Sequence, residues 1–259
     1  MNDISPLKSK VVWLTGASSG IGEAFARAVA LRGCQLAITA RRQEVLEKLA
    51  DEIRSQGGNV FVAPGDVTDL KQMEQAFSSI QSALGPIDVL VANAGNHIPT
   101  DVSRFDVAEY ESIFRINFFG AVNCIQLVLP SMIERLSGHV VGVSSVAGYR
   151  GLPKAAAYGA SKAALTHFLE SIRFDLAKYG VDVTVVSPGF VRTPLTDKND
   201  FPMPFLMEAE KAASAMVSGI ERRQLEVHFP KRFTFLLKLA RVLPYPLYHK
   251  LILSTVAKG

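Results

Sequence analysis

The stretch VVWLTGASSGIG, residues 11–22, runs an apolar segment directly into a turn with three glycines. The segment 11–14 predicts a buried strand, and apolar residues at helical spacing after the turn predict a helix over 22–32. So short a turn requires positive φ and close backbone approach, which glycine supplies at low cost. The helix amino terminus then presents unpaired N–H groups to an anion. We interpret the turn as a dinucleotide site formed by Gly16, Ser18, Ser19, Gly20, Ile21 and Gly22; the alternative is a Gly/Ser loop without a ligand.

The alternation of short apolar segments with longer amphipathic ones continues along the chain. Apolar, β-branched runs predict strands at 36–39, 60–62, 89–91, 140–143 and 183–186, and helices are predicted at 45–53, 69–84, 106–136 and 155–179. Strands that are apolar on both faces and alternate with helices are typical of a parallel sheet covered on both sides. We therefore expect an α/β fold with a doubly wound parallel sheet flanked by helices. It forms one domain over 1–230, followed by a carboxyl-terminal extension over 231–259.

Composition and charge indicate a globular protein with a basic end. The 259 residues are 48% hydrophobic and 20% charged, and the formal net charge is +4. The extension has no acidic residue, so the excess positive charge belongs to it. Its basic residues alternate with aliphatic ones and form no stripe with stacking aromatics, which argues against nucleic-acid binding. They are Lys231, Arg232, Lys238, Arg241, Lys250 and Lys258.

The amino terminus and the cysteines give no sign of export or of a metal site. Residues 1–10 lack the apolar core of a signal peptide, and we find no stretch of about 18 nearly uncharged apolar residues. A cytoplasmic location is therefore expected. Cys34 and Cys124 lie in apolar stretches without paired spacing, which predicts reduced core thiols and neither a disulfide nor a bound metal.

Two arginines, Arg41 and Arg42, follow the predicted strand 36–39. Dinucleotide folds that prefer NAD usually place an acidic residue here, where it binds the ribose 2′-hydroxyl. An acidic side chain would repel the 2′-phosphate of NADP, whereas an arginine pairs with it. The sequence therefore favours NADP. The alternative is that the two arginines only open a solvated helix.

Polar residues also follow the next two predicted strands. Asp66-Val67 comes after the strand 60–62, and Asn93-Ala94-Gly95 comes after the strand 89–91. Open parallel sheets bind ligands at the carboxyl ends of their strands, so both segments are candidate parts of the cofactor site. Asp66 is a candidate acceptor for an adenine amino group. Asn93 either contacts the cofactor or caps a turn.

Tyr158 and Lys162 lie four residues apart on a predicted helix, so their side chains share one face. A free tyrosine titrates near pH 10, but a nearby ammonium group stabilises the phenolate and lowers that pKa. The pair therefore predicts an acid/base group for neutral pH, although the same spacing is common on helix surfaces. Ser145 follows the strand 140–143 and offers a hydroxyl to a reacting oxygen.

In this order and at these spacings, the motifs resemble those of the short-chain dehydrogenase/reductase family. The resemblance covers about residues 10–195, and one departure is Ala92, where many relatives carry asparagine. It implies a Rossmann-like oxidoreductase that passes a hydride between NADP(H) and a carbonyl or alcohol carbon. It rests on the glycine turn, Asn93-Ala94-Gly95, Asn117, Ser145, Tyr158 with Lys162, and Pro188-Gly189 followed by Thr193.

The resemblance also implies a role for each residue. Tyr158 would be the acid/base, Lys162 would lower its pKa and hold the nicotinamide ribose, and Ser145 would orient the substrate oxygen. Asn117 would hold a water molecule behind the lysine. The segment Pro188, Gly189, Val191 and Thr193 would contact the nicotinamide half of the cofactor, with Val191 offering its backbone to the carboxamide.

The substrate side is less defined by the sequence. Residues 201–207, FPMPFLM, predict either an apolar lid over an apolar substrate or a loop that packs on the core or on a neighbouring subunit. The extension predicts two short helices that lie on an anionic membrane or pack on the catalytic domain or a partner subunit. Packing is favoured, because Pro244 and Pro246 interrupt the segment. The side chains expected to pack are Phe233, Leu236, Leu243 and Leu247.

The resemblance further predicts a homodimer or homotetramer formed through the helices 106–136 and 155–179. Apolar residues such as Phe119, Leu165 and Leu169 exceed what one sheet-facing stripe of these helices needs. Two functions without turnover stay open beside the oxidoreductase: a cofactor-binding sensor and a scaffold at a membrane surface. The complete set of Asn117, Ser145, Tyr158 and Lys162 favours the enzyme.

Overall fold

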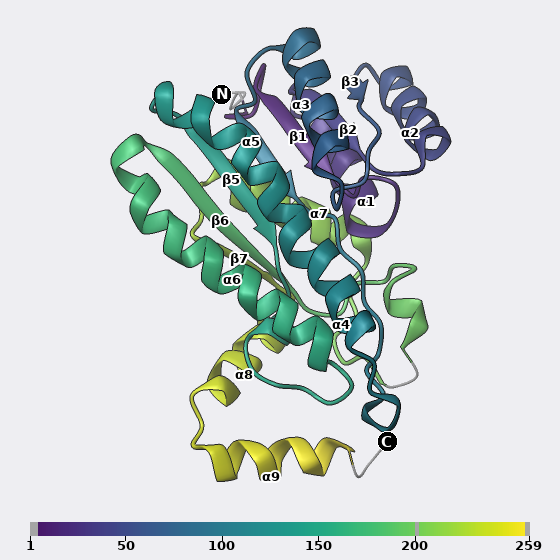
Figure 1. Ribbon diagram of the computed structural model, residues 1–259, viewed down its shortest axis with the longest axis vertical. Coiled ribbons are helices and arrows are strands. Elements are labelled where there is room, and N and C mark those ends of the chain that lie inside the picture. Colours follow the sequence, from purple (N-terminus) through teal and green to yellow (C-terminus); the bar gives the residue numbers. More distant parts are fainter. Residues whose placement is uncertain (1–4, 200–201, 257–259) are drawn as a thin grey trace.

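The computed structural model describes residues 5–199 and 202–256, and within them one parallel sheet forms the centre (Figure 1). The strand order is β3-β2-β1-β4-β5-β6-β7. This order reverses between β1 and β4, so the chain leaves these two strands in opposite directions and a crevice opens between their ends. The strands are β1 (Val11–Thr15), β2 (Gln35–Thr39), β3 (Asn59–Val62), β4 (Val89–Ala92), β5 (Gly138–Val143), β6 (Val181–Pro188) and β7 (Glu226–Phe229).

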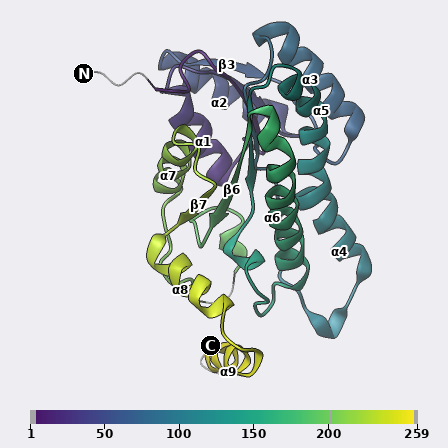
Figure 2. The same cartoon turned by 90° about the vertical axis from the view of Figure 1, so that its left-hand side faces the viewer.

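Helices cover both faces of the sheet (Figure 2). Two buried apolar clusters, one on each face, join the helices to the strands and confirm the doubly wound sheet. The sequence pattern predicts neither β7 nor α7; β7 is an edge strand in which the polar residues Glu226 and His228 alternate with apolar ones. One face carries α1 (Gly20–Ala30), α2 (Gln43–Ser55) and α7 (Ala209–Glu221), and the other carries α3 (Leu70–Leu84), α5 (Gly120–Glu134) and α6 (Ala156–Leu176).

The helix predicted over 106–136 is interrupted in the structure. α4 (Val107–Phe114) leads into a π-helical turn, Arg115–Phe119, from which α5 continues. Such turns contain an extra residue and often occur at functional sites. This one carries the fully buried Asn117. The hydrophobic pattern does not reveal it, because the apolar residues on either side keep helical spacing.

The same helix corrects the expectation that no long uncharged apolar stretch is present. Val107–Glu134 contains a window with a hydropathy of 1.6 that is long and apolar enough to cross a membrane. In the structure this helix packs in the core on one face of the sheet, where Cys124, Ile125, Val128 and Met132 are buried. Packing in the core therefore accounts for part of its apolar character, since 39% of this window is buried.

The extension forms the two expected helices, α8 (Lys231–Arg241) and α9 (Tyr245–Val256), at one end of the molecule (Figure 1). Phe233 packs inward as predicted and stacks on Phe190, with 5.4 Å between the ring centroids. Leu236 and Leu247 do not pack on the catalytic domain, since each is 56% exposed, and packing on a partner subunit stays a prediction for them. Among residues 231–254, for which burial is described, the buried ones are Thr234, Ala240 and Tyr248.

Arg150, in the loop after β5, binds the end of α8. Its Nη1 donates to the carbonyl oxygens of Ala240, Arg241 and Leu243, at 3.3, 3.0 and 2.7 Å. The last carbonyl groups of a helix have no partner within the helix, and a cation near them is favourable. Arg150 therefore caps α8 from the body of the protein.

The same guanidinium group also contacts α9. It lies over the rings of Tyr245 and Tyr248, 4.7 and 4.0 Å from their centroids. The hydroxyl of Tyr248 donates to the carbonyl oxygen of Gly151 at 2.7 Å. The loop 150–151 thus holds both helices of the extension in place.

Replacing Arg150 with alanine is expected to release the extension while the sheet stays folded. The variant loses hydrogen bonds from a charged group, which contribute about 2 kcal/mol in proteins. Limited trypsin digestion should therefore cleave at Lys231 or Arg232 several times faster than in the wild type. Arg150→Lys is the matched control. Its cleavage rate should lie between those of Arg150→Ala and the wild type, because one ammonium group cannot span all three carbonyls. Equal cleavage rates for Arg150→Ala and the wild type would contradict this role.

Candidate active site

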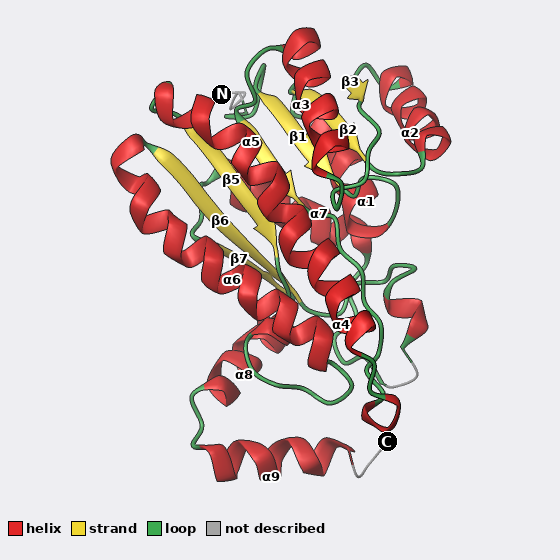
Figure 3. Ribbon diagram, viewed as in Figure 1, coloured by secondary structure: helices red, strands yellow, loops and turns green. Residues whose placement is uncertain are grey.

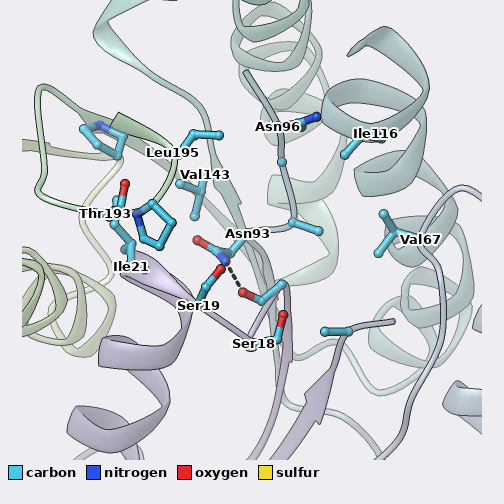
Figure 4. A pocket seen from close by; sticks show the side chains of 18 of the residues that line it. Ser18, Ser19, Ile21, Val67, Asn93, Asn96, Ile116, Val143, Thr193 and Leu195 are labelled. Atoms are coloured by element: carbon cyan, nitrogen blue, oxygen red, sulfur yellow. Dashed lines mark hydrogen bonds between the residues drawn. The ribbon is translucent and has the colours of Figure 1, made fainter. Parts of the chain in front are cut away.

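A cavity of about 650 Å³ opens where the strand order reverses, at the carboxyl ends of β1 and β4. The loops that build it gather at one edge of the sheet (Figure 3). Figure 4 shows Thr193 and Leu195 on one side of the cavity, Val67 and Ile116 on the other, and Asn93 between them. All residues that the sequence selects for cofactor binding line it: Gly16, Ser18, Ser19, Gly20, Ile21, Gly22, Arg41, Arg42, Asp66, Val67, Asn93, Ala94, Gly95, Tyr158, Lys162, Pro188, Gly189, Val191 and Thr193.

The glycine turn has the close backbone packing that its sequence predicts. Gly16 has a φ of +70°, and a Cβ atom there would lie 2.7 Å from the Cα of Ala94. A Cβ atom on Gly22 would lie 2.2 Å from the carbonyl oxygen of Gly16. No side chain fits at either position, so the backbone of the turn itself faces the cavity. This geometry suits the approach of a phosphate group to the amino terminus of α1.

Asn93 fastens the glycine turn to the end of β4. Its Nδ2 donates to the carbonyl oxygens of Thr15 and Gly16 at 3.0 and 3.2 Å. Its backbone N–H donates to the hydroxyl of Thr15 at 3.1 Å. Asn93 lines the cavity, and its amide group also holds the two loops together.

The two arginines lie after β2, on one side of the β1–β4 pair. Nη2 of Arg42 donates to the carbonyl oxygen and the hydroxyl of Ser18 at 3.1 and 3.0 Å, so this side chain already rests on the glycine turn. Nη1 of Arg41 lies 3.9 Å from Oδ2 of Asp66. Oδ1 of Asp66 accepts hydrogen bonds from the backbone and hydroxyl of Thr68, which leaves only Oδ2 for an adenine amino group.

Ser145 and Tyr158 lie on the opposite side of the pair, after β5 and on α6. Both side chains line the cavity. Burial raises the pKa of Tyr158, and the neighbouring Ser145 side chain lowers it by a smaller amount. The expectation that Lys162 lowers this pKa below its ordinary value is therefore wrong for this structure. The loss of hydration around the phenolate outweighs the favourable contacts.

Lys162 is buried, and its Nζ lies 5.8 Å from the ring centroid of Tyr158. Nζ donates to the carbonyl oxygen of Val143 at 2.8 Å. Burial lowers the pKa of Lys162 from 10.5 to about 8, because the charged form loses its hydration. The ammonium form is thus still the major one at neutral pH.

Asn117 lies behind Lys162 and does not line the cavity. Its Oδ1 accepts from the backbone of Asn96 at 2.8 Å, and its Nδ2 donates to the hydroxyl of Ser161 at 2.9 Å. A Cβ atom on Gly95 would lie 3.1 Å from this Oδ1 and 3.2 Å from Nζ of Lys162. A side chain at this position would crowd both polar groups, and the glycine avoids that contact.

Sequence reasoning underrates several residues that the structure brings to the site. His97 packs edge-on against Tyr158, with 4.7 Å between the ring centroids. Ser144 also lines the cavity, and its hydroxyl donates to the carbonyl oxygen of Lys162 at 2.9 Å. No motif marks residues such as these, because their positions depend on how loops from different strands meet. Further residues that line the cavity are Asn96, Ser112, Ile116, Val143, Pro194, Leu195 and Thr196.

Between Val191 and Met207 the structure describes residues 192–199 and 202–206, and the two ends of this segment are joined. Val191 pairs with Met207 in a parallel bridge. Of the described part of the predicted lid, 202–207, no residue lines the cavity; Phe205 instead stacks on Phe233 of α8 at 6.0 Å. Phe201 lies outside the described residues. Of the described residues of this segment, 193–196 line the cavity.

Comparisons with known proteins agree with this geometry. A family model described as short chain dehydrogenase matches residues 10–202. An uncharacterized oxidoreductase of Myxococcus xanthus is 41% identical over 245 residues, which are 95% of this chain and 97% of that protein. A fatty acyl-CoA reductase of Acinetobacter baylyi is 34% identical over 240 residues, with 91% of this chain and 79% of that protein covered. An alcohol dehydrogenase from the archaeon Thermococcus sibiricus, complexed with 5-hydroxy-NADP, superimposes with a TM-score of 0.77 at 26% identity, covering 85% of this chain and 95% of that one.

The buried ammonium group of Lys162 predicts a pH-dependent stability. Its pKa is about 8 in the folded protein and 10.5 without burial, so between these values the unfolded chain binds more protons. The wild type should therefore gain stability relative to Lys162→Met as the pH rises from 7 to 10, by up to about 3 kcal/mol. Urea unfolding at several pH values measures the difference. Lys48→Met, at an exposed lysine on α2, should show no such trend, and a pH-independent difference for Lys162→Met would refute the assignment.

Proposed function

The chain belongs to the short-chain dehydrogenase family, and from that premise we propose that it is an NADP(H)-dependent oxidoreductase acting on a carbonyl group or its alcohol. One observation carries this proposal. A single cavity has two arginines on one side and the side chains of Ser145, Tyr158 and Lys162 on the other. A cofactor-binding sensor without turnover would need the two arginines but not the group of Ser145, Tyr158 and Lys162.

The residues present fit NADP(H). Gly16 and Gly22 present bare backbone to a pyrophosphate, as the spaces without a Cβ atom indicate. Arg41 and Arg42 supply guanidinium groups for a 2′-phosphate, and Arg42 already contacts the turn that would hold the neighbouring phosphates. Lys162 and Thr193 line the part of the cavity that would receive the nicotinamide ribose.

The chemistry follows from the protonation states of the residues. When bound, NADPH supplies a hydride to a carbonyl carbon. Tyr158, with its raised pKa, keeps its proton at neutral pH and donates it from Oη to the substrate oxygen. Ser145 orients that oxygen, and the ammonium group of Lys162 stabilises the phenolate that remains. The protonated phenol favours reduction, and oxidation would run through the same residues with the proton returning to Tyr158.

We propose an apolar substrate. Ile116, Val143 and Leu195 bring aliphatic side chains to the cavity. Phe190, Phe205 and Phe233 stack next to the loop that borders it. The name of the Acinetobacter relative, a fatty acyl-CoA reductase, supports a carbonyl group carried on an apolar chain.

We also propose that the protein forms a homodimer or homotetramer and that it is located in the cytoplasm. Leu165 and Leu169 pack in the core, which corrects the idea that they are surplus apolar residues of the helices. Phe119 and Phe174 are 53% and 79% exposed on the same helices, so an apolar surface that could join subunits exists beside them.

The cofactor preference is tested by titrating the protein with NADPH and with NADH and following the fluorescence of the cofactor. Binding should favour NADPH at least tenfold, about 1.4 kcal/mol, because a charge-assisted contact to the 2′-phosphate is available. The double variant Arg41→Ala/Arg42→Ala should lose this preference and keep its affinity for NADH. Arg27→Ala, which removes an arginine paired with Glu23 and Glu52 outside the cavity, serves as the control. Equal affinities in the wild type would remove the argument from the arginines.

The proton donor is tested with Tyr158→Phe. The variant should bind NADPH as the wild type does and lose turnover, because general acid catalysis contributes 10²–10⁴-fold. Consumption of NADPH with a panel of apolar aldehydes and ketones measures this loss. Tyr149→Phe is the matched control, since the Tyr149 hydroxyl binds Glu226 and lies away from the cavity lining. More than about a tenth of the wild-type rate in Tyr158→Phe would exclude the assigned role.

A further inference from the structure

Large apolar side chains are concentrated on the outer side of the extension. Phe235 and Leu239 of α8 and Val242, which follows its last residue, recur at helical spacing and are 59%, 52% and 78% exposed. The inner side of the same helices is occupied, because Thr234, Ala240 and Tyr248 are buried there. We call the exposed set the outer face; it consists of Phe235, Leu236, Leu239, Val242, Leu247, Leu251 and Leu253.

Basic residues on the same two helices accompany the outer face. Lys231, Arg232, Arg241 and Lys250 are all exposed, and the sequence 231–259 contains no acidic residue. Lys238 differs from them because it pairs with Glu226 of β7. A buried interface between protein subunits is depleted of charge at its centre, whereas an anionic lipid surface attracts apolar and cationic side chains together. The charge of the extension therefore favours lipid as the partner of this face.

The structure removes the sequence-based argument against lipid binding. Pro244 and Pro246 divide the extension into helices that are too short to be stable alone. In the folded protein both helices are held by Arg150, and Tyr248 binds the carbonyl oxygen of Gly151 at 2.7 Å. The outer face is thus formed before any contact with lipid, and no helix has to fold at the membrane surface.

The outer face also lies at the edge of the sheet where the cavity opens. α8 begins two residues after the carboxyl end of β7 (Figure 1). Phe233 of α8 stacks on Phe190 and Phe205, on either side of the loop that borders the cavity. We propose that the outer face docks peripherally on an anionic lipid surface, so that this edge of the protein faces the membrane. This proposal does not depend on the oxidoreductase activity.

Vesicle co-sedimentation of the full chain tests the proposal. Vesicles of phosphatidylcholine with about one third phosphatidylglycerol should bind the protein at low salt. Binding should fall at least tenfold without phosphatidylglycerol or in about 0.5 M salt, where screening shortens to a few ångströms. Absence of binding to the anionic vesicles at low salt would overturn the proposal, and so would binding of equal strength to both kinds of vesicle.

Variants separate the outer face from the rest of the surface. Phe235→Ser/Leu239→Ser and Arg232→Gln/Arg241→Gln should each weaken vesicle binding at least tenfold, and Leu31→Ser, at an exposed leucine beyond α1, should not. Thermal unfolding by circular dichroism verifies the fold, and Val242→Ser replaces the first double variant if that one unfolds. Light scattering tests the alternative that the outer face joins copies of the chain. If Phe235→Ser/Leu239→Ser reduces an oligomer to smaller species while the wild type binds no vesicles, the face joins copies of the chain and the proposal is wrong.

Discussion

The parallel pairing of β1 with β4 is the constraint on which the rest of the structure depends. Val12 pairs with Val89 and Leu14 with Val91, and the chain then leaves the two strands in opposite directions. Asn93 holds the separated loops together across the gap. Because every other strand is placed relative to this pair, the residues after β2 and after β5 reach the same cavity from opposite sides.

The chemical end of the cavity is built from polar groups that burial disfavours. Burial raises the pKa of Tyr158 and lowers that of Lys162, so both tend toward their neutral forms. The carbonyl oxygen of Val143 and the hydroxyl of Ser145 compensate in part. The π-helical turn places Asn117 against the same region, where its amide donates two hydrogen bonds and accepts one. In the reaction that we propose, this arrangement supplies a proton donor and a cation that stabilises its conjugate base.

Sequence reasoning predicts the features that rest on local chemistry. The glycine turn, the parallel strands and the helical spacing of Tyr158 and Lys162 follow from propensity and periodicity. The π-helical turn, the contact of His97 with Tyr158 and the cap that Arg150 provides do not, because each depends on segments distant in the sequence. The direction of the Tyr158 pKa was mispredicted for the same reason, since burial is a property of the whole fold.

A crystal structure of the protein with NADPH tests the central claim most directly, because it requires no knowledge of the substrate. The account predicts that the pyrophosphate lies on the glycine turn and the 2′-phosphate within ion-pair distance of Arg41 or Arg42. The nicotinamide ring is then expected beside Tyr158 and Lys162, with space for a carbonyl group next to the hydroxyl of Ser145. A cofactor bound in the reverse direction, or outside this cavity, would contradict the account.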